Sequence, residues 1–442
     1  MHWIFGLGSV AVLLVAGSPH AVASDARAIA LGGATVANGQ GVHGAVTNPA
    51  SMMAMKRRNE SLHIRFGLYG EFRDTGDAID TLSDSSNEDL ISDIDAEIFS
   101  LSQTNIQCNP VTGIPADTCV TGTQRLSDLS TRMLKIIDLV DGETVDARLG
   151  SDFGAAYTRV RYPFAINLAI SATGSTRPDI ADNDRDYIED FAALLDDNEI
   201  TLEEVQNSSF LEVDALGLPL LVTQPEDVLQ SETSAEVLVR TQLGVSIATT
   251  LNIGQREFDL GITPKFSTLT AYRVEASVAD EFADSPESTA DRFEDSEISK
   301  SSFTFDVGGT MLIETPVVPV HVAAVIKNVV SESIRMNDGF TFNTEPQLLI
   351  GAALHRGMVS VTADMAVNPA KVDNFETQKI GVGVEFGTRL FSLRGGIGHD
   401  AARDNDATSL TLGFGLGPLE FGARLTGVES LETGFQLSHS FR

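Results

Sequence analysis

Three aspartates at alternate positions, Asp182, Asp184 and Asp186, come nearest in this chain to the spacing of a metal site. Carboxylate oxygens are the ligands that calcium prefers, and calcium-binding loops space them in this way. However, Tyr187 stands where such a loop needs glycine, and Ala193 stands where it needs a bidentate glutamate. We therefore expect no EF-hand. The segment either binds divalent cations loosely or is a solvated acidic loop.

Two cysteines, Cys108 and Cys119, are separated by ten residues in a polar stretch. Because an exported protein meets an oxidising compartment, this spacing favours a disulfide that closes a small loop. A redox or metal-binding pair is the competing interpretation, but neither a CxxC motif nor a flanking histidine accompanies these cysteines.

Catalysis requires a group of residues that the sequence does not offer. The eight histidines are scattered along the chain, and neither a GxSxG nor an HExxH motif is present. We therefore expect neither an enzyme nor a cofactor.

The acidic charge lies in three linkers. The chain has a net charge of −32, and residues 74–150, 174–236 and 274–300 carry −11, −15 and −7. Such surfaces repel nucleic acid, which we exclude as a partner. They suit divalent cations that bridge to lipopolysaccharide phosphates. Apolar residues recur at helical spacing in the first two linkers, which predicts partly helical loops.

The stretches between these linkers alternate between apolar and polar residues, and we count fourteen of them. A transmembrane barrel needs this period of two, because every second side chain faces lipid. The connectors are alternately long and short, as expected if tight turns lie at the periplasmic rim and long loops at the outer rim. The sequence predicts an all-β fold, a 14-stranded antiparallel transmembrane β-barrel over residues 61–442.

Charged residues occur at positions that should face the lumen of this barrel. A charge facing lipid at mid-bilayer would cost ~2–4 kcal/mol. We therefore expect the following side chains in the lumen or at a rim: Asp364, Lys379, Glu385, Arg394, Glu420 and Arg424. One feature favours a soluble, secreted β-protein instead. The single tryptophan lies near the amino terminus, so phenylalanine and tyrosine would have to supply the aromatic girdles.

Two segments precede the predicted strands. Residues 1–23 contain a long apolar run and end in Ala21-Val22-Ala23, which predicts a cleaved signal peptide. Residues 24–60 are rich in small residues, among them Gly32, Gly33 and the run Asn48-Pro49-Ala50. Small residues allow close packing, so we interpret this segment as a plug inside the lumen, with a disordered leader as the alternative. Asn48-Pro49-Ala50 forms either a kink that gates a channel or a turn that anchors the plug.

The segment Ala28–Ala34 and the run Asn48-Pro49-Ala50 are similar to the start of the FadL-type barrels, which are outer-membrane transporters of hydrophobic compounds. The wider pattern resembles more closely a sister group, the TraF-like outer-membrane proteins named after a conjugal transfer protein. Leu260–Phe266 and Ala324–Val329 carry much of this resemblance, which extends over nearly all of the mature chain. It implies a fourteen-stranded barrel with an N-terminal plug. No thioredoxin motif is present, so the resemblance does not imply a thioredoxin activity.

Two functions follow as expectations. The first is a role without catalysis in conjugal transfer or envelope assembly, with protein partners in the envelope. The second is passive transport or binding of a hydrophobic small molecule. In both, we expect the chain in the outer membrane, in contact with lipid and lipopolysaccharide.

Overall fold

A computed structural model of the chain describes residues 25–74, 131, 134–135, 141, 144–186, 189–190, 211–213, 219–221, 230–254, 256–277, 292–293, 295–372, 375–388, 390–402, 408–427 and 430–441. The cysteines Cys108 and Cys119 and the predicted signal peptide lie outside these residues.

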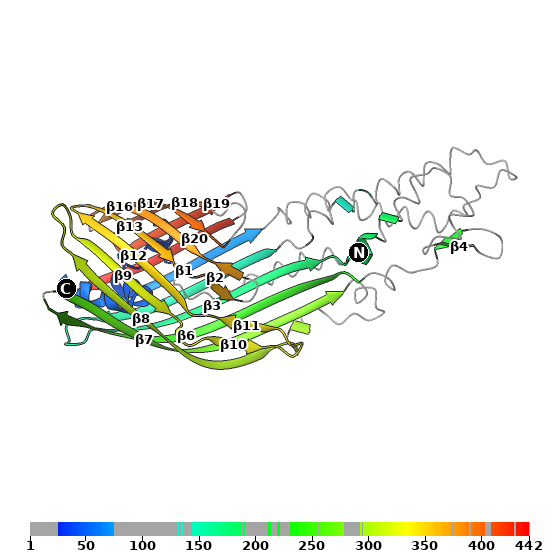
Figure 1. The fold of residues 1–442 in the computed structure, drawn as a ribbon, viewed down its shortest axis with the longest axis horizontal. Coiled ribbons are helices and arrows are strands. Elements are labelled where there is room, and N and C mark those ends of the chain that lie inside the picture. Colours follow the sequence, from blue (N-terminus) through cyan, green and yellow to red (C-terminus); the bar gives the residue numbers. More distant parts are fainter. Residues whose placement is uncertain are drawn as a thin grey trace.

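Fourteen antiparallel strands close into a barrel (Figure 1), which confirms the predicted fold class. The ring is complete because β20 pairs with β1, with Leu62 opposite Phe441. A closed ring leaves no unpaired sheet edge, which is the condition for strands to lie in lipid. In barrel order the strands are β1 (Leu62–Asp74), β2 (Val145–Tyr157), β3 (Phe164–Asp179), β6 (Glu232–Ile253), β7 (Arg256–Ser277), β8 (Ile298–Ile313), β9 (Val320–Lys327), β12 (Gln347–Arg356), β13 (Val359–Ala366), β16 (Lys379–Gly387), β17 (Phe391–Asp400), β18 (Thr408–Leu416), β19 (Leu419–Thr426) and β20 (Ser430–Phe441).

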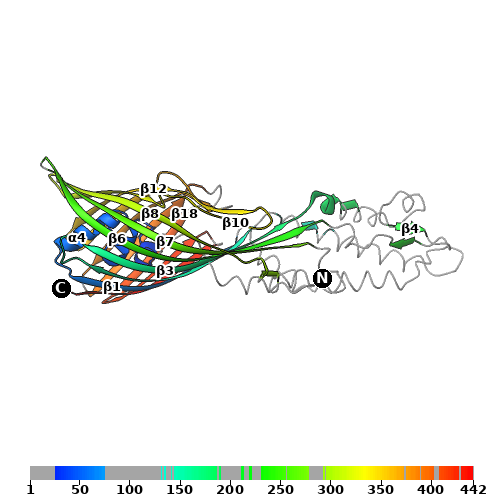
Figure 2. The same ribbon diagram turned by 90° about the horizontal axis from the view of Figure 1, so that it is seen from below.

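Residues 25–58 fold inside one end of the barrel, where α4 is seen among the strands in Figure 2, and we call this segment the plug. Its elements are α2 (Ala26–Ala30), α3 (Gly41–Thr47), the 3-10 helix η1 (Pro49–Ser51) and α4 (Met52–Arg57). Most of its side chains are buried. Because helices this short are marginal in isolation, contacts with the barrel wall must hold them in place.

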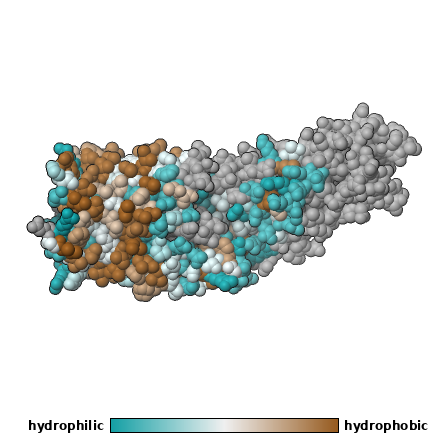
Figure 3. Space-filling view, viewed as in Figure 1, coloured by the Kyte–Doolittle hydropathy of each residue, from teal (hydrophilic) through white to brown (hydrophobic). Residues whose placement is uncertain are grey.

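The outer face of the barrel carries an apolar band. On β1, for example, Ile64, Phe66 and Leu68 are exposed, whereas the alternate residues His63 and Arg65 are buried. On the face seen in Figure 3, the band covers the end of the barrel that holds the plug, where the connectors are short, and hydrophilic surface lies towards the other end. We call these the short-turn end and the long-loop end. A closed barrel with such a band is suited to lie in a bilayer.

Several strands run further than the alternation predicted. The linkers expected at 74–150, 174–236 and 274–300 are too wide, because β2 begins at Val145, β3 ends at Asp179, β6 begins at Glu232 and β8 begins at Ile298. Beyond the apolar band a strand needs no apolar outer side, so the pattern that marks lipid-facing strands disappears there.

Two further sheets lie outside the barrel ring. The long connectors between β9 and β12 and between β13 and β16 form a four-stranded sheet of β10 (Glu332–Arg335), β11 (Thr341–Thr344), β14 (Ala370–Val372) and β15 (Phe375–Thr377). β4 (Leu211–Val213) pairs with β5 (Pro219–Leu221). Most of the helices predicted in the first two linkers fall outside the described residues.

None of the helices in the described part of the chain combines the length and the apolar character needed to cross a bilayer.

Candidate functional site

Glycines line much of the inner wall of the barrel where α2 lies against it. We call five of them the glycine belt: Gly383, Gly396, Gly413, Gly422 and Gly434. In the strand register, Gly383 lies opposite Gly396, and Gly422 lies opposite both Gly413 and Gly434. A Cβ on Gly396 would lie 2.8 Å from the carbonyl carbon of Leu31. Any side chain here would push the plug from the wall, so these positions need glycine.

The plug contacts all fourteen strands of the barrel. α2 lies against β17–β20, α3 lies against β1–β3 and β6, and η1 lies against β6–β8. The turn that follows α2 meets the remaining four strands. Val36 packs in a cluster with Ala323 of β9 and Leu349 of β12, and its N–H donates to Asp364 of β13 over 2.6 Å. Gly381 of β16 closely approaches the backbone of the same turn.

A chain of ion pairs joins α2 to the wall. Arg27 of α2 lies 2.6 Å from Glu385 on β16, and Glu385 lies 3.0 Å from Arg394 on β17. Arg394 in turn lies 3.2 Å from Glu420 on β19. Arg27 and Arg394 are almost completely buried, so each depends on these carboxylates for its charge to be tolerated.

A second buried cluster surrounds the start of the plug. Asp25 lies 2.9 Å from His43 of α3 and 3.5 Å from Arg65 of β1, and Arg65 lies 2.7 Å from Asp152 of β2. Burial by itself raises the pKa of Asp25, but His43 and Arg65 together hold it below its usual value. Asp25 is therefore a carboxylate at neutral pH, and it also caps α2 by accepting a hydrogen bond from Ala28.

A third group of polar contacts between the plug and the wall lies on the opposite side of the plug. Asp306 of β8 lies between Lys265 of β7, at 2.6 Å, and Lys327 of β9, at 2.9 Å. The ammonium of Lys327 also donates to the backbone carbonyl of Val46 in α3. The plug is thus bound to the wall by polar contacts on several sides.

The residues of the predicted plug motif all lie at points of close contact. Gly32 and Gly33 follow α2 with φ angles of 69° and 92°, a conformation that favours glycine. Asn48 is fully buried, accepts a hydrogen bond from Ala50 and donates to the carbonyl of Gly309 on β8 over 3.3 Å. Asn48-Pro49-Ala50 thus forms the start of η1 against the wall, the geometry of a turn that anchors the plug. A gating role for it stays a prediction.

The three aspartates of the acidic motif do not converge. Asp184 is buried and accepts hydrogen bonds from the N–H groups of Gln230 and Ser231, whereas Asp182 and Asp186 are exposed. Within the described part of the chain, no cluster of three or more metal-ligating side chains is found. Loose cation binding by this segment, and the disulfide between the two cysteines, stay predictions.

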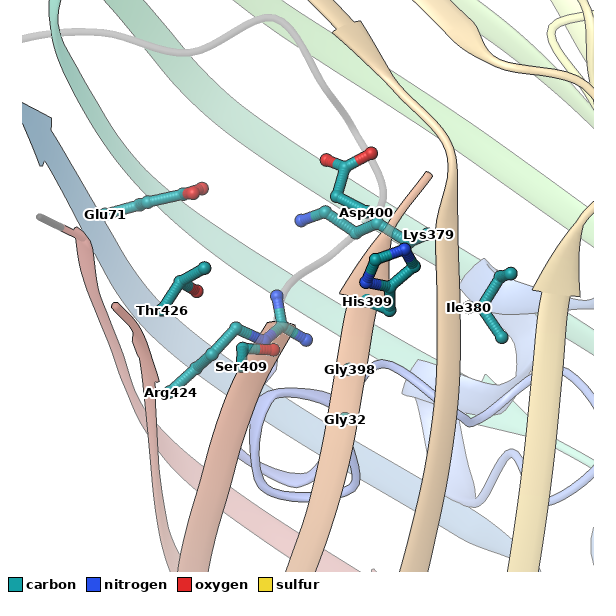
Figure 4. A pocket seen from close by; sticks show the side chains of 10 residues that line it. All are labelled: Gly32, Glu71, Lys379, Ile380, Gly398, His399, Asp400, Ser409, Arg424 and Thr426. Carbon is teal, nitrogen blue, oxygen red and sulfur yellow. The ribbon is translucent and has the colours of Figure 1, made fainter. Parts of the chain in front are cut away.

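A cavity lies on the long-loop side of α2. The unfilled space there, counted together with the open solvent beside it, is about 940 Å³. A smaller pocket adjoins it and reaches Asp400; Figure 4 shows the side chains of Lys379, Arg424 and Glu71 among those that line it. Charged residues line the cavity: Glu71, Arg148, Asp364, Lys379, Arg424 and Glu432.

The six charges expected on the lumen side occupy that side in the structure, facing either the plug or this cavity. The sequence pattern did not identify the charged residues that hold the plug, which are Asp25, Arg27, His43 and Arg65. The sequence did contain a signal of close contact between the plug and the wall. Glycines occupy alternate, lumen-facing positions on two neighbouring strands: Gly381 and Gly383, then Gly396 and Gly398.

Among solved structures, the chain is similar to the toluene transporter TodX of P. putida, with 10% identity and a TM-score of 0.44, covering 95% of this chain and 98% of that one. It is also similar to the transport unit of the autotransporter AIDA-I from Escherichia coli, with 9% identity and a TM-score of 0.32, covering 89% and 97%. Similarities this low do not bear on what the chain binds or transports.

A search of curated protein sequences finds no match to the chain. One protein-family model does match, over residues 45–365, which is well over half of the chain. The matched segment runs from the end of α3 to β13 and so includes the last part of the plug, with η1 and α4, and nine of the fourteen barrel strands. This chain therefore belongs to the family described as F plasmid transfer operon, TraF, protein.

Proposed function

We propose that this chain is an outer-membrane β-barrel that works without catalysis as a plugged anchor in the cell envelope, in conjugal transfer or envelope assembly. One observation carries the proposal: the plug contacts all fourteen strands. A plug that is built into the wall on every side favours a closed barrel over an open channel.

The buried charges around the plug also favour a closed barrel over an open channel. A path for a hydrophobic compound needs apolar walls, because an apolar solute gains nothing by leaving one aqueous or polar surface for another. Here Asp25, Arg27 and Arg65 lie buried in the layer between the two ends of the barrel. Opening a path would separate buried ion pairs, which is strongly unfavourable.

Location in the outer membrane is part of the proposal. The apolar band and the closed ring suit lipid, and the predicted signal peptide would direct export. We place the short-turn end in the periplasm, where Lys56 of α4 donates to the carbonyls of Val160 and Arg161 over 2.9 and 3.1 Å. The long-loop end, which carries the acidic linkers, then faces outward and is where we place contacts with protein partners, lipopolysaccharide and divalent cations.

Conductance across planar bilayers tests the closed lumen. We expect the purified barrel to pass little steady current, and a variant lacking residues 25–58 to conduct as an open pore. An Arg27→Ala and Arg65→Ala double variant keeps the plug while removing two of its ties, and we expect intermittent openings. Large, steady currents through the unaltered barrel would contradict the plugged anchor.

Transfer assays test the cellular role. In a donor strain from which the gene is deleted, we expect conjugation frequency or outer-membrane assembly to fall, and to recover with the unaltered chain. A variant lacking residues 75–143 keeps every barrel strand and serves as the loop-deleted form. Full recovery with this variant would argue against partner contacts through the first loop.

A second candidate, passage or binding of a hydrophobic small molecule, has one observation in its favour. The cavity beside α2 is lined partly by apolar side chains, including Ile29, Val36 and Leu349. Uptake of toluene into cells or liposomes that carry the barrel tests this candidate. Uptake that is independent of the long loops would replace the first proposal with the second.

A further inference from the structure

We propose that the cavity on the long-loop side of the plug binds the carboxylate of a compact organic acid, with Lys379 as the cation that recognises it. This binding site goes beyond the proposed function, and it holds whether the barrel is an anchor or a transporter. The argument rests on which of the charges around the cavity are neutralised by protein partners.

Most charges around the cavity have partners in the protein. Arg148 lies 3.2 Å from Glu71, and Arg424 pairs with Glu432. Asp364 accepts a hydrogen bond from the N–H of Val36. These contacts neutralise or solvate each group within the wall.

Lys379 differs from these residues. Its ammonium makes no hydrogen bond or ion pair within the part of the chain that the structure describes, although it lines both the cavity and the smaller pocket. Asp400 lies opposite Lys379 in the register of β16 and β17 but forms no ion pair with it. Instead, Oδ1 of Asp400 accepts hydrogen bonds from the N–H groups of Gln378 and Ala402.

An ammonium in a partly enclosed space is poorly solvated, and an anion that reaches it restores favourable interactions. Two neutral side chains at the same wall, Gln347 and Thr377, can donate further hydrogen bonds to such an anion. Lys379 supplies the charge, and these two side chains supply polar groups on the lining of the same cavity.

The charge balance favours a monoanion over a phosphate ester. A doubly charged phosphate would bring a second negative charge next to Glu71, Asp364 and Glu432, which line the same cavity. One carboxylate matches the charge of Lys379 and meets less of this repulsion than a dianion does.

The rest of the cavity indicates the body of the ligand. Ile29 and Val36 of the plug and Leu349 of β12 form apolar surface beside the charged wall. The cavity is partly open to solvent, so the ligand that fits it best is no larger than a small ring or a short chain. We therefore expect a compact acid with an apolar body, for which benzoate is a suitable probe.

Calorimetric titration of the purified barrel in detergent tests the site, with benzoate, its neutral analogue benzamide, and phenyl phosphate as probes. We expect benzoate to bind at least about tenfold more tightly than benzamide, as the gain of one charged hydrogen bond implies. Lys379→Gln should remove this difference, and Lys379→Arg, which keeps the charge, should retain most of it. Lys300→Gln is the matched control, because Lys300 is exposed and donates to the carbonyl of Ser333 at the long-loop end.

Each variant is first checked for the heat-dependent gel shift of a folded barrel. The assignment is overturned if folded Lys379→Gln binds benzoate as tightly as the unaltered chain, or if benzoate at millimolar concentration does not bind to the unaltered chain at all. Equal affinities for benzoate and benzamide would also overturn it, and tighter binding of phenyl phosphate would overturn the choice of a monoanion. None of these outcomes changes the conductance expected of the plugged barrel, so the two proposals fail separately.

Discussion

Gly422 illustrates how closely the plug and the wall approach each other at the scale of single residues. A Cβ at this position would overlap the carbonyl oxygen of Ala26, which is backbone and cannot rotate away. We expect Gly422→Ala to lower the free energy of unfolding by about 1–3 kcal/mol, as overpacking does. Urea titration of the barrel in detergent, followed by the gel shift, measures this loss.

Gly395 provides the control for this substitution. It lies on β17, in the same part of the barrel, but the nearest atom to its Cβ position would be 3.7 Å away. Gly395→Ala should therefore change stability by no more than about 0.5 kcal/mol. Equal losses in the two variants would mean that the glycine belt is not needed for the plug.

Glu385 links the plug to the wall by accepting from both Arg27 and Arg394. Replacing it by glutamine leaves the buried Arg27 without its carboxylate. We therefore expect Glu385→Gln to lower the free energy of unfolding by about 3–5 kcal/mol. Glu420→Gln should cost less, because Arg394 keeps Glu385. Thermal denaturation of both variants compares them, and a larger loss in Glu420→Gln would contradict this order.

Sequence alone could indicate which side of the wall Glu385 and Arg394 face, but it could not identify their partners. Alternation placed Glu385 and Arg394 on the lumen side, because a charge on the lipid side is too costly. It could not pair Glu385 with Arg27, since 358 residues separate them and only the closed barrel brings them together. The partners of a buried charge are decided by tertiary structure.

Arg273 shows, at the scale of elements, how the β10–β11 hairpin is held at the long-loop end. It contacts Glu236 of β6 at 3.1 Å, pairs with Asp338 and lies over the ring of Phe340 at 4.3 Å. Arg273→Ala should weaken the hairpin's attachment by about 1–2 kcal/mol without affecting barrel closure. Hydrogen exchange of residues 332–344 measures this, and Arg256→Ala at the other end of β7 is the control.

Acid should release the same hairpin only at low pH. Burial raises the pKa of Asp338, but hydrogen bonds from the Phe340 backbone and from Arg273 outweigh this effect and lower it below 3.8. A carboxylate with a lowered pKa stabilises the fold above its ordinary pKa, and this contribution is lost as pH falls through the lowered value. We therefore expect exchange in the hairpin to stay slow at pH 5 and to increase below pH 4, and an increase already at pH 6 would contradict this.

The hairpin was also the element that the sequence did not predict. β10 and β11 each have four residues, too few to give an alternation that stands out from a loop. Ile334, Met336 and Phe342 pack against the inner sides of β6 and β7, at Leu238 and Leu269. That surface exists only because β6 and β7 extend past the apolar band, where the alternation gave no guide.

Closure is a property of the whole molecule, since it joins the first barrel strand to the last. Every residue of β1 from Leu62 to Arg73 is paired with β20. Alternation predicts strands and their faces, and the number of strands makes closure possible, but this pairing is not local. The same closure places the glycine belt of the last five strands around α2, which is contributed by the first residues of the plug.

The last strand is therefore expected to be indispensable for the barrel. Removing Ser430–Phe441 would leave β1 and β19 with unpaired edges in lipid, where each unsatisfied backbone group costs several kcal/mol. We expect this truncated chain to lack the heat-dependent gel shift entirely. Removing residues 370–377 deletes β14 and β15, which lie outside the ring, and should leave the shift intact. A normal shift without β20 would mean that the ring closes in another way, and the plug would then have to be held by a wall of different composition.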